Sequence, residues 1–148
     1  MRIPPFNQYG GVPPGVYRCT LREALDRFGQ GSFQRRAVAA RLERVYELVA
    51  KTGQIARFIV FGSFIAEKSD PNDVDIVVLM KDTFELDRQS GDVTVVLNHL
   101  EAQTRFGASV FWMRQCAAIG GEDSMIEYFQ VRRSGGKRGI IEIVREVS

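Results

Sequence analysis

The chain has 148 residues, of which 45% are hydrophobic, and its formal net charge at pH 7 is only +2. This length and composition predict a single domain with one core, and so small a net charge does not by itself indicate a nucleic-acid-binding protein. The chain lacks a long apolar run and an apolar signal region near its start, so we expect a cytoplasmic protein with no membrane-spanning segment. Because it has a single histidine, neither a Ser-His-Asp triad nor a zinc hydrolase centre is expected.

The two cysteines, Cys19 and Cys116, lie far apart and lack the short spacing of paired metal ligands. In a reducing compartment both would remain thiols. We therefore expect both to be ordinary packing residues.

Residues 1–16 contain four of the five prolines, together with Gly10, Gly11 and Gly15. Proline fixes φ and removes a hydrogen-bond donor, so this segment is expected to be an extended arm rather than a helix. The remaining residues, 17–148, are expected to form the single domain.

Two helices are predicted next. Thr20 and Glu23 have the spacing of a capping box, which predicts a helix over 21–28. Ser32 is placed to cap a second helix, whose apolar residues recur at three- and four-residue steps until Gly53. The other face of this second helix carries four arginines: Arg35, Arg36, Arg41 and Arg44. Such a face is more often solvated than a polyanion site, and a position beside a phosphate-binding turn would reverse that interpretation.

A Gly-Ser turn upstream of an Asp-x-Asp pair is the most informative pattern in the chain. The apolar run at 58–61 is typical of a buried strand, and Gly62 and Ser63 follow it. Backbone N–H groups at such a strand end can face an anion, and glycine lets a phosphate approach the main chain. After a polar turn, Asp73 and Asp75 open the next apolar strand.

The two aspartates predict a metal site. Side chains of a strand alternate, so the carboxylates of Asp73 and Asp75 are expected on one face, roughly 6–7 Å apart at the backbone. Carboxylates this close repel each other unless a cation lies between them. Mg²⁺ (or Mn²⁺) prefers such oxygen ligands and usually shares them with substrate phosphates, so metal-bound nucleotide chemistry is expected here.

Helices and strands alternate in the rest of the chain. The apolar pattern predicts a helix at 92–106, a strand at 108–113, a helix at 124–132 and a last strand at 139–144. The whole order predicts an α+β fold with a mixed central β-sheet and helices packed mainly on one face.

A basic, glycine-containing turn separates the last predicted helix from the last strand. Its cations are Arg132, Arg133, Lys137 and Arg138. Glycines next to cations allow a loop to wrap a phosphate, and they equally suit a plain hairpin loop. Both interpretations stay open at this point.

The Gly-Ser turn and the Asp-x-Asp pair together resemble the active-site signature of the nucleotidyltransferase superfamily, which has the DNA polymerase β-like fold. Here the signature reads Phe61-Gly62-Ser63, nine intervening residues, and then Asp73-Val74-Asp75-Ile76. A wider set of motifs resembles a family of small bacterial proteins with a nucleotidyltransferase-like core: Ile3-Pro-Pro-Phe6, Val12-Pro-Pro-Gly15, Gly62-Ser-Phe64 with Lys68, Pro71-Asn-Asp-Val-Asp75, Tyr128-Phe-Gln130 and Gly139-Ile-Ile-Glu-Ile143.

The resemblance implies a substrate, a reaction and a set of site residues. The substrate would be a Mg²⁺-bound nucleoside triphosphate, expected to be ATP, from which a nucleoside monophosphate is transferred to a hydroxyl of protein or RNA. Asp73 and Asp75 would be the catalytic metal ligands. Gly62 and Ser63 would contact the β- and γ-phosphates, and Lys68 would neutralise charge on the leaving pyrophosphate. Further contacts to the triphosphate or the acceptor would come from the basic turn: Arg132, Arg133, Lys137 and Arg138.

Enzymes of this superfamily usually carry a third carboxylate on the next core strand. In the strand at 108–113 the corresponding position is Ser109, which cannot supply a negative charge. Four acids elsewhere are possible substitutes: Asp92, Asp123, Glu127 and Glu142. The last lies between isoleucines and is the most suggestive, although half-exposed strands commonly alternate in this way.

Two other functions stay open. Without a third carboxylate, the domain would be a catalytically silent nucleotidyltransferase fold that recognises a partner protein or RNA, as in a toxin–antitoxin or phage-defence pair. Alternatively, the arginines of 35–44 and the cations of 132–138 would form one stripe that binds nucleic acid, with an affinity that falls steeply with salt and survives EDTA. Few aromatic residues accompany those cations, which makes the stripe the weakest of the three interpretations.

Overall fold

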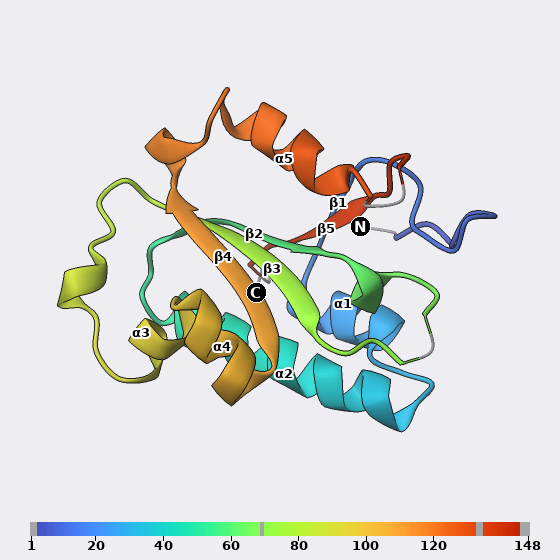
Figure 1. Ribbon diagram of the computed structural model, residues 1–148, viewed down its shortest axis with the longest axis horizontal. Helices are drawn as coiled ribbons and strands as arrows, with labels where there is room; N and C mark the ends of the chain where they lie inside the picture. Colours follow the sequence, from blue (N-terminus) through green and yellow to red (C-terminus); the bar gives the residue numbers. More distant parts are fainter. Residues whose placement is uncertain (1–2, 69, 133–134, 146–148) are drawn as a thin grey trace.

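The fold is built on one mixed β-sheet (Figure 1). The computed structural model describes residues 3–68, 70–132 and 135–145. Within them, a five-stranded sheet has the strand order β1-β5-β2-β3-β4. The strands are β1 (Val16–Cys19), β2 (Ile55–Phe61), β3 (Val74–Met80), β4 (Ala108–Arg114) and β5 (Ile140–Ile143).

Parallel and antiparallel pairings occur in the same sheet. β2 and β3 form an antiparallel pair, and β5 joins the other side of β2, also antiparallel. β4 runs parallel to β3, and β1 runs parallel to β5. The predicted α+β class with a mixed central sheet is therefore confirmed.

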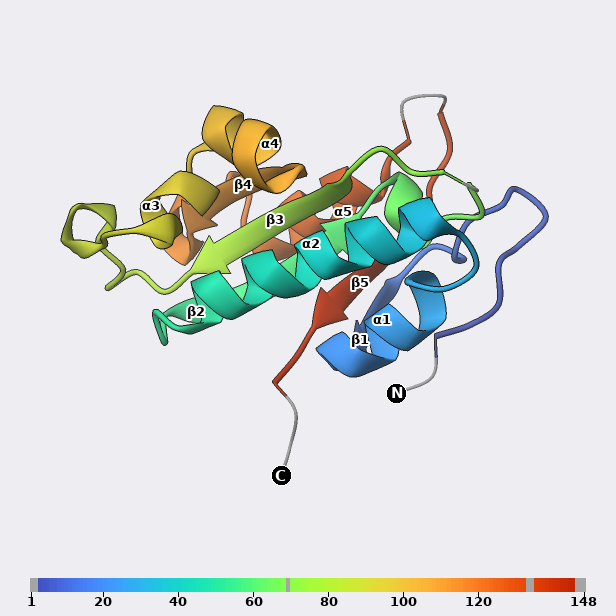
Figure 2. The same ribbon diagram turned by 90° about the horizontal axis from the view of Figure 1, so that it is seen from below.

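The helices cover the two faces of the sheet unequally (Figure 2). In the described part of the chain they are α1 (Leu21–Phe28), α2 (Phe33–Ala50), α3 (Asp92–Val96), α4 (His99–Phe106) and α5 (Glu122–Gln130). The first four share a core with one face of the sheet, whereas α5 packs on the opposite face. None of these described helices has both the length and the apolar character needed to cross a bilayer.

Both faces of the central strands are buried, which explains their nearly continuous apolar sequences. Along β3, Ile76 and Val78 face the core under α1 to α4, while Val77 and Leu79 face the core under α5. All four side chains are fully buried. The sheet is therefore a rigid layer from which residues at the strand ends project.

The first two helices begin where the sequence predicts. The Thr20 hydroxyl accepts a hydrogen bond from the backbone N–H of Glu23 at 3.2 Å, and the Glu23 carboxylate accepts one from the backbone N–H of Thr20 at 2.9 Å. The Ser32 hydroxyl accepts a bond from the backbone N–H of Arg35 at 3.0 Å. Caps of this kind contribute about 1 kcal/mol each to helix stability.

The single helix predicted at 92–106 is wrong, because two helices occupy this segment. Asn98 lies between them, and its side chain accepts a hydrogen bond from the backbone N–H of Glu101. This cap starts α4, which ends at Gly107 with a left-handed φ of +62°. The apolar spacing continues through the break, so periodicity alone does not reveal it.

The sequence does not predict β1. Val16, its first residue, falls in the segment expected to be an arm, and the strand pairs with β5 from Val16↔Ile140 to Cys19↔Ile143. A four-residue strand whose partner lies near the other end of the sequence leaves no local signal.

The arm that precedes β1 packs on the domain. Val12 is fully buried, and its carbonyl accepts a hydrogen bond from the N–H of Gly139 at 2.7 Å. The carbonyl of Gly10 accepts a bond from the N–H of Glu67 at 2.8 Å. Arg27 of α1 donates to two arm carbonyls at 3.0 and 3.2 Å. The arm thus connects α1, the segment after the Gly-Ser turn, and the start of β5.

The two cysteines have different environments. Cys19 is buried, and burial is the main cause that raises its pKa to about 12. Cys116 is exposed, so the prediction that it is an ordinary packing residue is wrong; it lies in a 3₁₀ turn at Gln115–Ala117, where its backbone N–H donates to Asp82 at 2.8 Å.

This difference predicts selective thiol chemistry. At pH 8 the Cys19 thiol stays protonated and inaccessible, whereas Cys116 can be reached by reagent. We expect a disulfide-exchange reagent to titrate one thiol in the folded protein and both after unfolding in guanidinium. Two thiols that react at the same rate in the folded protein would contradict the burial of Cys19.

Candidate active site

The end of the β2–β3 pair brings the Gly-Ser turn against the Asp-x-Asp pair. Phe61, the last residue of β2, is paired with Asp75 of β3. Gly62 follows with φ +83° and ψ −159°, a conformation that residues with a side chain rarely adopt. A Cβ atom added at Gly62 would lie 2.1 Å from Oδ2 of Asp75. Only glycine therefore allows the backbone of the turn to lie this close to the carboxylate.

Arg35 of α2 holds the segment that follows Gly62. This segment begins with a 3₁₀ turn at Ser63–Ile65. The Arg35 guanidinium donates hydrogen bonds to the backbone carbonyls of Phe28, Phe64, Ala66 and Lys68. Burial lowers the pKa of Arg35. This member of the arginine face is therefore neither solvated nor directed at a polyanion, because it fixes the loop after the Gly-Ser turn.

Ser63 and Lys68 both belong to this held segment. Ser63 is half-buried at the start of the 3₁₀ turn, directly after Gly62. Lys68 is exposed, while its backbone carbonyl accepts a bond from Arg35. Ser63 thus lies just after the end of β2, near the start of β3, and Lys68 lies at the surface further along the same loop.

Arg138 brings the basic turn to the Gly-Ser turn. Its Nη1 atom donates to the carbonyl of Gly62 at 3.4 Å. Burial, and secondly the charge of Arg132, lower the pKa of Arg138. In both arginines the Nε atom is buried, and the residues that the structure describes provide it with no hydrogen-bond partner. Arg132 and Arg138 are therefore close enough for their charges to interact, and Arg138 also reaches the Gly-Ser turn.

Lys137, the remaining cation of the basic turn within the described residues, does not converge with these two. Lys137 forms an ion pair with Glu127 of α5 at 2.5 Å, and this contact lowers the pKa of Glu127. A β-bridge between Val131 and Lys137 closes the turn. Arg133 lies outside the described residues. The turn is thus hairpin-like and also presents Arg138 to the Gly62 backbone.

Ser109 occupies the position beside Asp75 on the neighbouring strand. In the parallel β3–β4 pair the register aligns Asp75 with Ser109. The serine is buried, at 6% exposure. Within residues 3–68, 70–132 and 135–145, no group of three or more His, Cys, Asp or Glu side chains is arranged to hold a metal ion.

Three of the acids considered as substitutes have partners elsewhere. Glu142 lies in β5, beyond β2 from Asp75, and its carboxylate accepts hydrogen bonds from Arg57 at 2.7 and 3.2 Å. Asp92 pairs with Arg44 at 3.2 Å, and Glu127 pairs with Lys137. The fourth, Asp123, is exposed on α5.

Asp73 and Asp75 carry the type of donor atom that Mg²⁺ prefers. Both offer hard carboxylate oxygens, with the Ser63 hydroxyl nearby in the sequence of the turn and no thiolate or imidazole in the motif. Mg²⁺ is commonly held by one or two carboxylates, with substrate phosphates and water filling the remaining positions. Asp73 and Asp75 would hold the ion, and a triphosphate would supply further oxygens.

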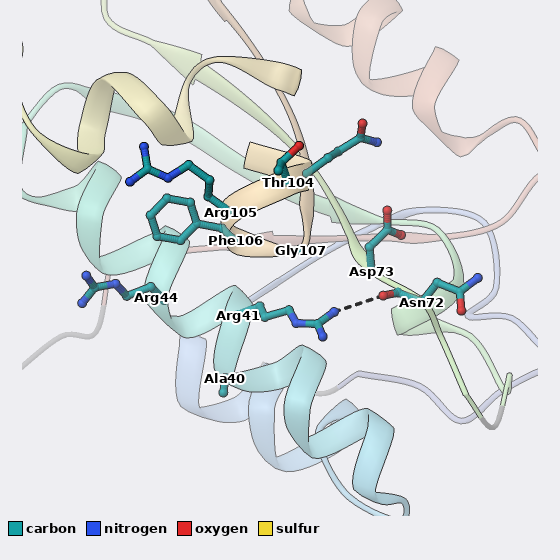
Figure 3. A pocket seen from close by; sticks show the side chains of 10 residues that line it. Ala40, Arg41, Arg44, Asn72, Asp73, Thr104, Arg105, Phe106 and Gly107 are labelled. Atoms are coloured by element: carbon teal, nitrogen blue, oxygen red, sulfur yellow. Dashed lines mark hydrogen bonds between the residues drawn. The ribbon is translucent and has the colours of Figure 1, made fainter. Parts of the chain in front are cut away.

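Asp73 also lines an open groove of about 740 Å³ between α2 and α4 (Figure 3). The figure shows Asp73 and Asn72 at one end, with Arg44 and Arg105 toward the other. The lining residues are Ala40, Arg41, Arg44, Asn72, Asp73, Gln103, Thr104, Arg105, Phe106 and Gly107.

Arg41 lies in the middle of this groove. Its Nη1 atom donates to the carbonyl of Asn72 at 3.1 Å. Its side chain passes so close to Gly107 that a Cβ atom there would lie 2.9 Å from Cδ of Arg41. The glycine that ends α4 therefore makes room for Arg41 beside the Asp-x-Asp strand.

Sequence reasoning identified Arg41 and Arg44 as part of an arginine face but missed Arg105 and Phe106. Their place in the groove follows from the parallel β3–β4 pairing, which sets the start of β4, and hence the last turn of α4, beside Asp73. The sequence Arg105-Phe106-Gly107 precedes β4. It would have indicated a place beside Asp73 only if the pairing of β3 with β4 had been known.

Comparison with known proteins identifies the family of this chain. No curated protein and no solved structure matches the chain. The family match runs from the proline-rich arm to the residue after β5 and includes both halves of the Gly-Ser and Asp-x-Asp pattern. The chain belongs to DUF6932, a family of unknown function, whose model matches residues 4–144.

Proposed function

We propose that this protein is a minimal domain of the nucleotidyltransferase type, which binds a nucleoside triphosphate as its Mg²⁺ (or Mn²⁺) complex. The contact between Gly62 and Asp75 carries the proposal, because a phosphate-binding turn and a metal-binding carboxylate need to be adjacent for a metal-bound phosphate to contact both. The antiparallel β2–β3 pair and the parallel β3–β4 pair support a nucleotidyltransferase-like fold around that contact.

The basic turn supports the same ligand. A triphosphate on Gly62 would lie next to Arg138, whose guanidinium already reaches the Gly62 carbonyl. Terminal N–H groups of Arg132 and Arg138 would then donate to phosphate oxygens, and the repulsion between the two cations would be relieved.

The proposed reaction is the transfer of a nucleoside monophosphate to a hydroxyl of protein or RNA. The hydroxyl oxygen forms a bond to the α-phosphorus, and the bond from that phosphorus to the oxygen bridging the β-phosphorus breaks. Pyrophosphate leaves with the electron pair, and the hydroxyl proton passes to solvent. A bound Mg²⁺ would supply charge stabilisation on the phosphates. Gly62, Ser63 and Arg138 would orient the triphosphate by binding its oxygens.

A second candidate is a catalytically silent fold that binds a partner protein or RNA. Ser109 favours it, because a neutral side chain stands beside Asp75 where a third carboxylate would help to activate the hydroxyl. The first candidate transfers a nucleoside monophosphate, whereas the second has no catalytic activity. Both would bind a nucleotide only if the silent fold has retained the nucleotide site.

Asp75→Asn tests the nucleotide site. MgATP and the other triphosphates are titrated into the protein by calorimetry, and the substitution is expected to weaken binding by at least about tenfold because it removes a charged metal ligand. EDTA is expected to weaken binding of the unmodified protein similarly. Asp70→Asn is the matched control, since Asp70 is exposed in the same loop and its loss changes the net charge equally.

The outcomes separate the candidates. Metal-dependent binding that requires Asp75 supports the proposal, and radiolabelled pyrophosphate release with added acceptors then tests transfer. If millimolar MgNTP does not bind, or if Asp75→Asn and Asp70→Asn behave alike, the nucleotide site is rejected and the silent, partner-binding fold takes its place. A thermal melt of each variant confirms that it is folded.

A further inference from the structure

We propose that the groove between α2 and α4 binds a single strand of nucleic acid, with phosphates on Arg41, Arg44 and Arg105. This surface differs from the stripe considered from sequence, because Arg35 is directed to backbone carbonyls and Arg138 to the Gly62 turn. It uses Arg105, which sequence reasoning did not single out.

The charge of the groove favours a polyanion. Three guanidiniums line it, against one carboxylate, that of Asp73. Arg44 pairs with Asp92 at 3.2 Å, and both side chains are about half exposed, so this contact is weak. Each guanidinium has five donors, so a single contact to Asp92 or to the Asn72 carbonyl leaves most donors of Arg44 and Arg41 for phosphate oxygens.

The shape of the groove favours a strand rather than a compact ligand. Arg41 and Arg44 are three residues apart on α2, so they lie on one helix face, and Arg105 approaches from α4. The groove is open rather than enclosed, and cations lie along it instead of converging on a single point (Figure 3). A repeating phosphodiester supplies one negative charge for each such cation.

Phe106 distinguishes a nucleic acid from an acidic peptide. Its ring lines the same groove and is packed against the larger core, so it offers a fixed aromatic surface. Bases stack on such surfaces with little dependence on sequence. Gln103 provides a neutral donor beside it. A peptide made only of aspartate and glutamate could use the arginines but has no aromatic ring to stack on Phe106.

Asp73 determines which end of the bound nucleic-acid strand would lie at its end of the groove. Its carboxylate repels phosphates, so the end of the strand nearest Asp73 is expected to be a hydroxyl rather than a phosphate. That hydroxyl would be the acceptor, a role that rests on the proposed function. Binding of the strand does not depend on it, because the three groove arginines are separate from Gly62 and Asp75; Asp73 is the residue that lines both sites.

Fluorescence anisotropy with a labelled single-stranded RNA tests the groove. The assay contains EDTA and no nucleotide, so that it is independent of the triphosphate site. Arg44→Gln and Arg105→Gln are each expected to weaken binding about 3- to 10-fold and to lower the slope of log affinity against log salt by about 0.7. Arg36→Gln is the matched control, because Arg36 is exposed on the same helix outside the groove.

Binding measurements with two other polyanions identify the class of ligand. Single-stranded DNA of the same sequence separates the two sources of phosphodiester, and a polyglutamate peptide represents an acidic protein. The proposal is overturned if neither strand binds, if Arg36→Gln weakens binding as much as Arg105→Gln, or if only the peptide binds at the groove. Loss of strand binding with intact MgATP binding would reject the groove alone, and the reverse would reject the nucleotide site alone.

Discussion

Gly62→Ala is expected to abolish MgNTP binding and to lower the free energy of unfolding by about 3 kcal/mol. Part of this cost is backbone strain, since alanine at φ +83° and ψ −159° occupies a region that is essentially restricted to glycine. The rest arises because the new Cβ atom would lie 2.1 Å from Oδ2 of Asp75, so either the turn or the carboxylate has to move. Calorimetry and urea denaturation measure the two effects.

Gly53→Ala provides the matched control for this experiment. Gly53 also has a positive φ, +67°, but a Cβ atom there would meet no atom within 4 Å. We expect it to cost about 1–2 kcal/mol of stability through strain alone and to leave MgNTP binding unchanged. If Gly62→Ala costs no more than Gly53→Ala, the close approach between Gly62 and Asp75 is wrong.

Arg57→Met is expected to destabilise the protein by about 3–5 kcal/mol, because it leaves the Glu142 carboxylate buried without its main partner. The side chains of Arg57 and Glu142 are 16% and 7% exposed, and two hydrogen bonds, of 2.7 and 3.2 Å, join them. The hydrogen bond to Glu142 raises the pKa of Arg57. Arg18 reaches the same carboxylate at 3.4 Å but is itself mostly exposed, so it replaces little of the loss.

Two further variants check this explanation by urea denaturation. The double variant Arg57→Met with Glu142→Leu removes both charges and is expected to recover most of the lost stability. Asp92→Asn breaks the exposed pair with Arg44 and is expected to cost less than about 1 kcal/mol. An Arg57→Met variant as mildly affected as Asp92→Asn would show that the buried pair contributes no more than a surface one.

Local signals in the sequence were sufficient for the elements that carry the site. The capping box of Thr20 and Glu23, the apolar run before Gly62 and the strand after Asp73 all depend on neighbours in the chain, and the structure contains each of them. The resemblance to the nucleotidyltransferase superfamily led us to expect Ser109 on the strand next to Asp75, and the β3–β4 register aligns these two residues.

Features that depend on distant partners were not predictable in the same way. β1 is defined by pairing with β5, and the break at Asn98 is defined by a cap inside an uninterrupted apolar pattern. The role of Arg35 is likewise invisible in sequence, because its four carbonyl partners come from α1 and from the loop after Gly62. An arginine on a helix has the same spacing whether it faces water or main chain.

The position of β5 in the sheet constrains the order in which this chain can fold during synthesis. β5 lies between β1 and β2, and its residues, Ile140–Ile143, are made more than a hundred positions after Val16. Until these residues have been made, β1 has no strand to pair with and β2 has an open edge. Closing so long a loop slows folding and leaves an aggregation-prone intermediate. The sheet is therefore expected to close only after β5 has been made.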